Sequence, residues 1–204
     1  TIKVFGPKYA LHSGQYGNYA PNPVFEAARL ISSLKDERGI VQIPGFYDGV
    51  LLTERDKQLL ATIPENNDSL NFRLGIFNSE QVAPTYQEAL QFPSLNIRGL
   101  KSAYTGKEVR TLIPEDVIIE IDMRLVPETP AERQLELLRN HILKQGYHLV
   151  DSVPNSHDRA TFKKLASLEY RIGSKPFRTD MDTDIGKFLN TALRKVFGDK
   201  IVNM

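Results

Sequence analysis

The stretch Val117-Ile118-Ile119-Glu120-Ile121-Asp122-Met123-Arg124-Leu125-Val126 decides the fold of this chain. Side chains of a strand point alternately to its two faces, so every second residue shares a face. One face is apolar throughout and carries Val117, Ile119, Ile121, Met123 and Leu125. The opposite face carries Glu120, Asp122 and Arg124. The pattern predicts a strand of an antiparallel sheet with one face in a core and the other toward solvent or a partner.

Two helices are predicted on either side of this strand. Asn22-Pro23 is typical of a helix start, and an apolar stripe follows it at helical spacing over residues 22–38. Thr129-Pro130-Ala131-Glu132 has the pattern of a capping box with proline at the first helical position. Gly146 is the expected end of that second helix.

Further strands are predicted over residues 2–11, 95–98 and 147–153. The order of strands and helices predicts an α+β fold, a ferredoxin-like four-stranded antiparallel sheet with two helices on one face. Residues 40–93 are predicted to be an insertion with helices near 53–62 and 79–91 and a loop tip around 64–69. After a polar stretch to about residue 170, residues 182–197 form a further predicted helix outside the sheet.

Composition excludes several classes of function. The chain has 204 residues, 41% hydrophobic and 25% charged, with a net charge of +1 and no cysteine. This balance is typical of a globular protein and gives no electrostatic basis for binding nucleic acid or an anionic membrane. No apolar run approaches the ~20 residues of a membrane span, and no signal peptide is evident. We expect the protein to be cytoplasmic. We also expect it to be longer than these 204 residues, because both ends resemble internal positions.

Five strings, in order, resemble one family: Leu11-His12-Ser13-Gly14-Gln15-Tyr16-Gly17, Pro44-Gly45-Phe46-Tyr47-Asp48, Tyr104-Thr105-Gly106, Thr111-Leu112-Ile113-Pro114 and Arg124-Leu125-Val126-Pro127. The set resembles the lid domain of carnosinase-like dipeptidases, in the two-zinc superfamily of aminoacylases, desuccinylases and carboxypeptidases. One position departs from the family pattern, which often has an acidic residue where this chain has Ala10.

The resemblance implies where the domains of the chain begin and end, and what the chain contributes to the full-length enzyme. Residues 1–153 would be the lid, or dimerisation, domain, and 154–204 a linker with the first helix of a returning catalytic domain. The full-length enzyme would be a dipeptide-hydrolysing homodimer with two zinc ions, dimerised through a sheet edge or the 22–38 helix. This chain alone would bind no zinc and hydrolyse nothing.

His12 is the candidate catalytic residue. By itself, a histidine between a strand end and a glycine-rich turn is most simply a loop residue that satisfies backbone groups. The resemblance implies that it enters the active site of the other subunit. There an imidazole N–H would stabilise the negative charge that grows on the carbonyl oxygen during hydrolysis.

Arg124 and Thr111 are the candidate substrate-binding residues. Arg124 is either a solvated charge paired with Glu120 or Asp122, or a fork for the substrate's terminal carboxylate. Thr111 is either an ordinary residue at a strand entry or a hydroxyl donor to the substrate. For Arg124 the resemblance favours the second interpretation, and for Thr111 it gives the two interpretations equal weight.

The remaining candidate ligands give no metal motif. His141, His148 and His157 lack metal-ligand spacing. Asp180, Asp182 and Asp184 are spaced like calcium ligands, but the glycine and distal glutamate of such a loop are missing, so helix capping is the expected role.

The sheet pattern alone also allows a stand-alone ferredoxin-like module. RNA binding requires exposed strand aromatics and a basic face, which residues 117–126 lack. A regulatory domain that binds a small molecule remains the alternative hypothesis.

Overall fold

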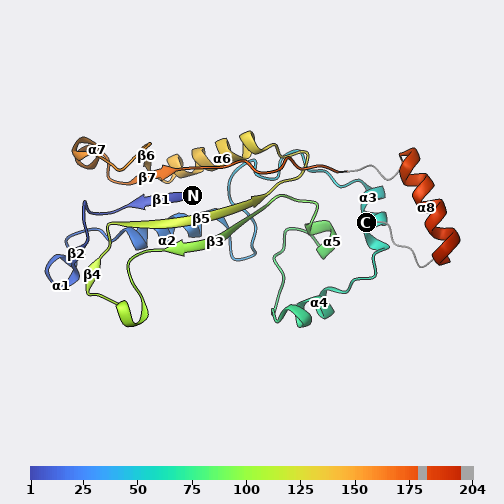
Figure 1. Cartoon of the computed structure of the whole chain (residues 1–204), viewed down its shortest axis with the longest axis horizontal. Coiled ribbons are helices and arrows are strands. Elements are labelled where there is room, and N and C mark those ends of the chain that lie inside the picture. Colours follow the sequence, from blue (N-terminus) through green and yellow to red (C-terminus); the bar gives the residue numbers. More distant parts are fainter. Residues whose placement is uncertain (179–182, 199–204) are drawn as a thin grey trace.

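The computed structural model describes residues 1–178 and 183–198 and has an α+β architecture (Figure 1). Its main sheet has five strands in the order β3-β5-β1-β7-β6. These are β3 (Ser94–Lys101), β5 (Asp116–Arg124), β1 (Ile2–Phe5), β7 (Leu165–Leu168) and β6 (His148–Leu149).

β5 has the two-faced character that its sequence predicts. It pairs antiparallel with β1 on one side and with β3 on the other. Val117 and Ile119 are fully buried, and Ile121 and Met123 pack against the same core. Glu120 and Asp122, on the opposite face, are half-exposed, and Arg124 is exposed.

The prediction of a four-stranded, wholly antiparallel sheet is wrong. β7 lies between β1 and β6, antiparallel to β1 and parallel to β6, so the sheet is mixed and has five strands. The sequence of β7, Leu-Ala-Ser-Leu, is short and half of it is small residues with weak strand preference. Its long-range pairing on both sides stabilises it as a strand, and no local pattern reveals that pairing.

Two helices, and the segment that follows the first of them, pack against the sheet and form the core with it. α2 (Pro23–Leu34) begins at Asn22, whose side chain accepts from the backbone N–H of Val24, as predicted. α6 (Ala131–Lys144) ends before Gly146, also as predicted. Both helices contribute buried side chains to the core cluster that contains Ile2 and Ile119.

The predicted capping box of α6 does not form. Pro130 is the cap residue of this helix and makes no side-chain cap hydrogen bond. The Thr129 hydroxyl instead lies 3.1 Å from both the backbone N–H and the carbonyl oxygen of Val126. It therefore fastens the turn between β5 and α6 rather than the first turn of the helix.

The 40–93 segment is only partly an insertion. Val41, Ile43 and Phe46 are buried in the main core, so its first ten residues belong to the sheet-and-helix body. Beyond them lie α3 (Glu54–Ala61), α4 (Asn67–Leu74) and α5 (Tyr86–Ala89). Residues 64–66 of the predicted loop tip are a loop, but residues 67–69 form the first turn of α4, because Asn66 accepts from the backbone N–H of Ser69 and caps the helix.

The remaining elements lie at the two ends of the sheet. Beyond one end, β2 (Leu11–His12) pairs with β4 (Leu112–Ile113), next to α1 (Ser13–Tyr16), η1 (Gly106–Glu108) and α7 (Ser156–Thr161). Beyond the other end lie the insertion helices and α8 (Asp184–Phe197), as Figure 1 shows. Within the described residues, no helix is both long and apolar enough to cross a membrane.

Candidate functional site

His12 lies at the end of β2, where the chain turns into α1. Its Nδ1 accepts a hydrogen bond of 3.1 Å from the backbone N–H of Gly14. Because Nδ1 is an acceptor, the neutral imidazole carries its proton on Nε2, which makes Nε2 a donor. The ring is exposed, so this donor is presented at the surface.

Gly14 is required for this placement of the ring. A methyl group built on Gly14 would lie 2.9 Å from Cε1 and 3.1 Å from Nδ1 of His12. Ordinary contacts between carbon atoms are about 3.5–4.0 Å. The imidazole can therefore fold over the backbone of α1 only because residue 14 has no side chain.

Thr111 lies beside His12. The residue that follows it, Leu112, is the partner of His12 in the β2–β4 ladder. The Thr111 carbonyl oxygen also accepts a hydrogen bond of 3.3 Å from the backbone N–H of Ser13. The structure thus brings together two of the three predicted site residues, from segments a hundred residues apart.

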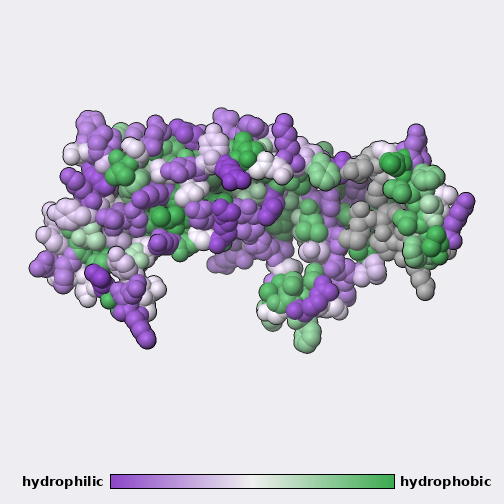
Figure 2. All heavy atoms as spheres, viewed as in Figure 1, coloured by the Kyte–Doolittle hydropathy of each residue, from purple (hydrophilic) through white to green (hydrophobic). Residues whose placement is uncertain are grey.

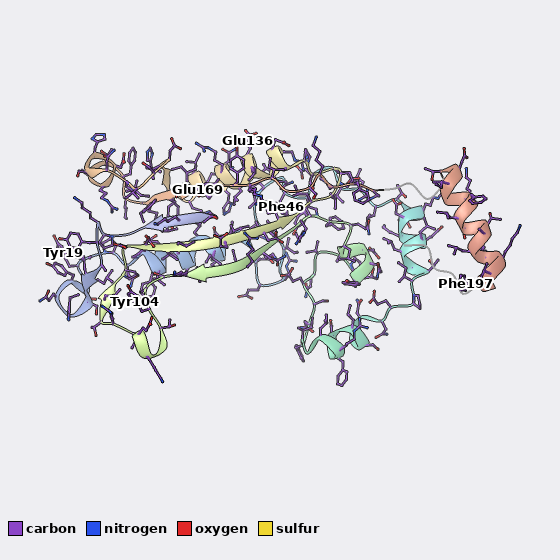
Figure 3. All side chains as sticks on the ribbon, in the orientation of Figure 1. Tyr19, Phe46, Tyr104, Glu136, Glu169 and Phe197 are labelled. Carbon is purple, nitrogen blue, oxygen red and sulfur yellow. The ribbon has the colours of Figure 1, made fainter. Side chains whose placement is uncertain are left out.

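Exposed tyrosines surround this end of the molecule. Tyr19 and Tyr104 are labelled there in Figure 3. The guanidinium carbon of Arg110 lies 5.2 Å from the centre of the Tyr104 ring, a cation–π distance. Tyr104 belongs to one of the five family strings, but nothing local in the sequence indicates that residues 19 and 104 share an end of the fold.

Arg124 lies at the opposite end of the sheet. It is the last residue of the nine-residue strand β5, roughly 27 Å along the strand from Asp116. Asp116 pairs with Phe5, at the end of β1 that leads toward His12. A dipeptide spans only about 7 Å, so Arg124 cannot contact the same dipeptide as His12 and Thr111 of its own chain.

The Arg124 side chain is 81% exposed, and its Nε donates to Oδ2 of Asp122 at 3.1 Å. The ion pair that the sequence suggested is thus present, and at this exposure it contributes about 0–1 kcal/mol. An exposed, weakly held guanidinium is free to bind another carboxylate. The structure therefore accommodates both interpretations of Arg124.

A cleft of about 710 Å³ opens at the Arg124 end of the sheet. Its walls are β5, the start of α6 and the extended segment 169–177, which brings Arg171 and Lys175 to the rim. Arg98 also lines the cleft and pairs with Glu120 at 3.3 Å. A hydrogen bond from the Thr1 hydroxyl, and then one from Arg98, lower the pKa of Glu120. Sequence reasoning missed this cleft, since residues 169–177 carry no motif.

No group of three or more potential ligands for a metal ion occurs among the described residues. Two of the other histidines have structural partners: buried His141 bonds to the Ser33 hydroxyl, and the His148 ring stacks on Phe162. Asp180 and Asp182 lie outside the described residues, and α8 is capped by the Thr183 side chain.

Comparisons with known proteins point in one direction. The model of the peptidase dimerisation domain family, M20_dimer, matches residues 1–149. The Cys-Gly metallodipeptidase of Candida albicans is 31% identical over 147 residues, which are 71% of this chain and 30% of that protein. The Beta-Ala-His dipeptidase of Rattus norvegicus is 26% identical over 204 residues, covering 97% of this chain and 39% of that protein.

A solved structure agrees with these matches. The M20 family metallo-carboxypeptidase of Sulfolobus solfataricus is 28% identical, with a TM-score of 0.68, over 97% of this chain and 42% of that one. The chain thus spans less than half the length of each of these three relatives.

Proposed function

The chain belongs to the M20 peptidase dimerisation domain family, and from this premise we propose that it is the lid and dimerisation domain of a metal-dependent dipeptidase. The proposal takes its substrate class from relatives that are named Cys-Gly and Beta-Ala-His dipeptidases. Since β7 lies inside the sheet, we place the end of the domain after Leu168, later than the predicted residue 153. The expected cytoplasmic location stays a prediction.

We propose that the metal site of the enzyme lies in a separate catalytic domain, because this chain spans less than half the length of its relatives and its described residues hold no group of three or more potential ligands. We propose two zinc ions there, which when bound would activate water and polarise the peptide carbonyl. The present chain contributes the imidazole of His12. Its Nε2–H would donate to the carbonyl oxygen and bind it more strongly as negative charge develops.

The single observation that carries the proposal is the separation of His12 and Thr111 from Arg124. Ser94, at the start of β3, pairs with Arg124, whereas Lys101, at its end, pairs with Ile118. Arg124 therefore lies beside the start of β3, and His12 and Thr111 lie beyond its end. This arrangement supports an active site shared between two subunits.

A dimer through β3 completes such a site. Among the described residues β3 is an edge strand, so the backbone groups that point away from β5 have no partner strand. A two-fold axis perpendicular to the sheet pairs it antiparallel with the same strand of a second subunit. The start of one β3 then lies beside the end of the other. Arg124 of one subunit would bind the substrate carboxylate, while His12 and Thr111 of the other reach the scissile bond.

Exposed apolar side chains on α2 favour a dimer interface at the same surface. The exposed face of α2 carries Val24 and Phe25, and a shallow groove of about 190 Å³ separates α2 from β3. Ile31 and Leu34 line this groove from α2, and Leu95 and Ile97 line it from β3. A second copy paired along β3 would cover both the strand edge and this helix.

Complementation in the full-length enzyme tests the shared site. His12→Ala and Arg124→Ala are made in separate chains, and each homodimer is expected to be impaired. The His12→Ala substitution alone should lower kcat by about 10²–10³-fold. Co-expression of the two variants should restore activity, because each mixed dimer has one site with an intact His12 and an intact Arg124. In contrast, a chain with both substitutions, co-expressed with the wild type, gives mixed dimers in which both sites are damaged.

The outcome decides between a shared site and a self-contained one. A self-contained site would give the reverse order, because the dimer of the double variant with the wild type would then keep one intact site. That order, or equal activity in the two kinds of mixed dimer, would reject the arrangement. Unchanged turnover by the His12→Ala homodimer would reject the catalytic role of the imidazole.

A further inference from the structure

The segments that carry His12 and Thr111 form an arm outside the core of the molecule. The arm consists of residues 7–20 and 102–114, which contain β2, α1, η1 and β4, and is called the His12 arm below. None of its residues belongs to the core cluster, and within it only Ile113 and Pro114 are buried. Figure 2 shows mainly hydrophilic side chains at this end of the molecule. Apolar packing therefore does little to fix the direction in which the arm points.

Three segments meet at the neck of the His12 arm, which consists of Gly6, Pro23 and Glu115. Gly6 directly follows β1, and its N–H donates to the carbonyl oxygen of Glu115, just before β5, at 2.7 Å. The ring of Pro23 packs so closely on Gly6 that a Cβ at residue 6 would lie 2.6 Å from Cγ of the proline. Residue 6 must therefore be glycine. Because glycine has the widest choice of backbone angles, this packing places an easily bent residue at the neck.

Arg159 of α7 holds this glycine from outside the arm. Its half-buried guanidinium donates from Nη1 to the carbonyl oxygen of Gly6 at 2.5 Å, and from Nε to that of Pro154 at 3.3 Å. Both backbone groups of Gly6 are thus hydrogen-bonded, and the bond to its carbonyl orients the peptide plane that leads into Pro7. Arg159 lies beyond residues 1–149, which match the family model, so the resemblance to the family does not indicate it.

α7 is itself attached to the sheet. Asn155 and Asp158 form a capping box that closes its first turn. Phe162, the residue after the helix, stacks on the ring of His148 in β6, with the ring centres 3.5 Å apart. Figure 1 shows α7 at the same end of the sheet as β2 and β4. Arg159 therefore connects the neck of the arm to the edge of the sheet that lies farthest from β3.

We propose that Arg159 is a positioning residue for His12: it holds the neck and so fixes the direction in which the imidazole is presented. A tilt of roughly 3–6° at the neck, over a lever of roughly 10–20 Å, moves the ring by about 1 Å. Such a misplacement costs up to about 10²-fold in rate. This inference rests on the proposed function, in which the imidazole must reach a substrate that the other subunit binds.

Kinetics of the full-length enzyme test the role of Arg159. Arg159→Ala should lower kcat by about 10-fold, because the neck loses a hydrogen bond while the His12 ring remains. Arg159→Lys keeps a donor for the Gly6 carbonyl and should restore most of the activity. Lys163→Ala, which removes an exposed cation from the same segment, should leave kcat unchanged. In a His12→Ala background, Arg159→Ala should cause no further loss, because the group that it displaces is gone.

A nitroxide spin label measures the motion of the arm without reference to activity. The label is attached at Gln15→Cys in α1 or, as a control, at Glu136→Cys in α6; both positions are exposed. The 204 residues contain no cysteine, and any cysteines outside them are replaced by serine. Arg159→Ala should narrow the spectrum of the label at residue 15, because the arm moves faster. Arg159→Lys should not narrow it, and neither variant should change the label at residue 136.

The outcomes separate this inference from the function on which it rests. An unchanged label at residue 15 in the Arg159→Ala enzyme overturns the inference. It is also overturned by an unchanged kcat in Arg159→Ala when His12→Ala is impaired, or by an equal loss with and without His12. An unimpaired His12→Ala enzyme overturns the proposed function instead, and the label then decides alone whether Arg159 holds the arm.

Discussion

Replacing Gly14 with alanine should move the His12 ring and slow catalysis in the full-length enzyme without unfolding it. The new methyl group would lie 2.9 Å from Cε1 of His12, so the imidazole must retreat by roughly 0.6–1 Å to reach an ordinary contact distance. A misplacement of about 1 Å costs up to about 10²-fold in rate. We therefore expect kcat to fall by about 10–100-fold, or about 1.4–2.7 kcal/mol in activation free energy.

The fold should tolerate this change. Gly14 is not among the glycines with a positive φ, so alanine can adopt its backbone conformation. Gly14 also lies in α1, where alanine is favoured over glycine by up to about 1 kcal/mol. The melting temperature should be maintained, and exposed Gln15→Ala in the same helix should leave kcat unchanged.

A double-mutant cycle shows whether Gly14 acts through His12. If it does, Gly14→Ala has no further effect on kcat once His12 is alanine, because the ring that it displaces is gone. Two results would refute the reasoning. One is an unchanged kcat in the Gly14→Ala enzyme, and the other is an additional loss in the double variant that equals the loss in the single one.

Two further predictions concern stability. Ile119 is 0% exposed at the centre of the sheet, so Ile119→Ala should lower the free energy of unfolding by about 2–5 kcal/mol. Urea denaturation measures this loss, with the exposed Ile185→Ala as the control. A loss smaller than that of the control would contradict the prediction. Burial, and then the charge of Lys144, lower the pKa of His141 below its usual 6.5, so the unfolded chain takes up a proton there first. The free energy of unfolding should therefore have its full value above pH 6.5 and decrease as the pH falls below it. Between pH 8 and pH 5 the melting temperature should decrease less for His141→Gln than for the wild type. Equal decreases in the two proteins would rule out His141 as the cause.

The parts of the fold that the sequence predicts are those stabilised by local patterns. The alternation in β5, the Asn22 cap of α2 and the glycine after α6 all hold in the structure. β7 could not be predicted, because its four residues become a strand only through pairing with β1 and β6. The capping box at Thr129 failed for a related reason: tertiary packing assigns that hydroxyl to the turn at Val126.

The candidate site divides in the same way. His12, Thr111 and Arg124 are candidates because they lie in motifs that resemble those of a family. Their roles stay predictions. The contact between Thr111 and Ser13, and the distance from both to Arg124, depend on strand register. Register is set by the whole hydrophobic pattern of the sheet and not by any one motif. A sequence can therefore identify candidate site residues without showing that they lie at opposite ends of the sheet.

The pairing of β1 with β7 also bears on how this domain moves. The backbone of Thr1 exchanges two hydrogen bonds with that of Glu169, of 2.8 Å and 3.0 Å, so the pairing of β1 with β7 continues as far as Thr1 and Glu169. Any element joined at this end of the β1–β7 pair would be attached to a two-stranded ribbon and not to a single tether. Such a ribbon bends readily across its flat face but resists twisting and sideways shear. Motion of such an element relative to the sheet would then follow one swing direction.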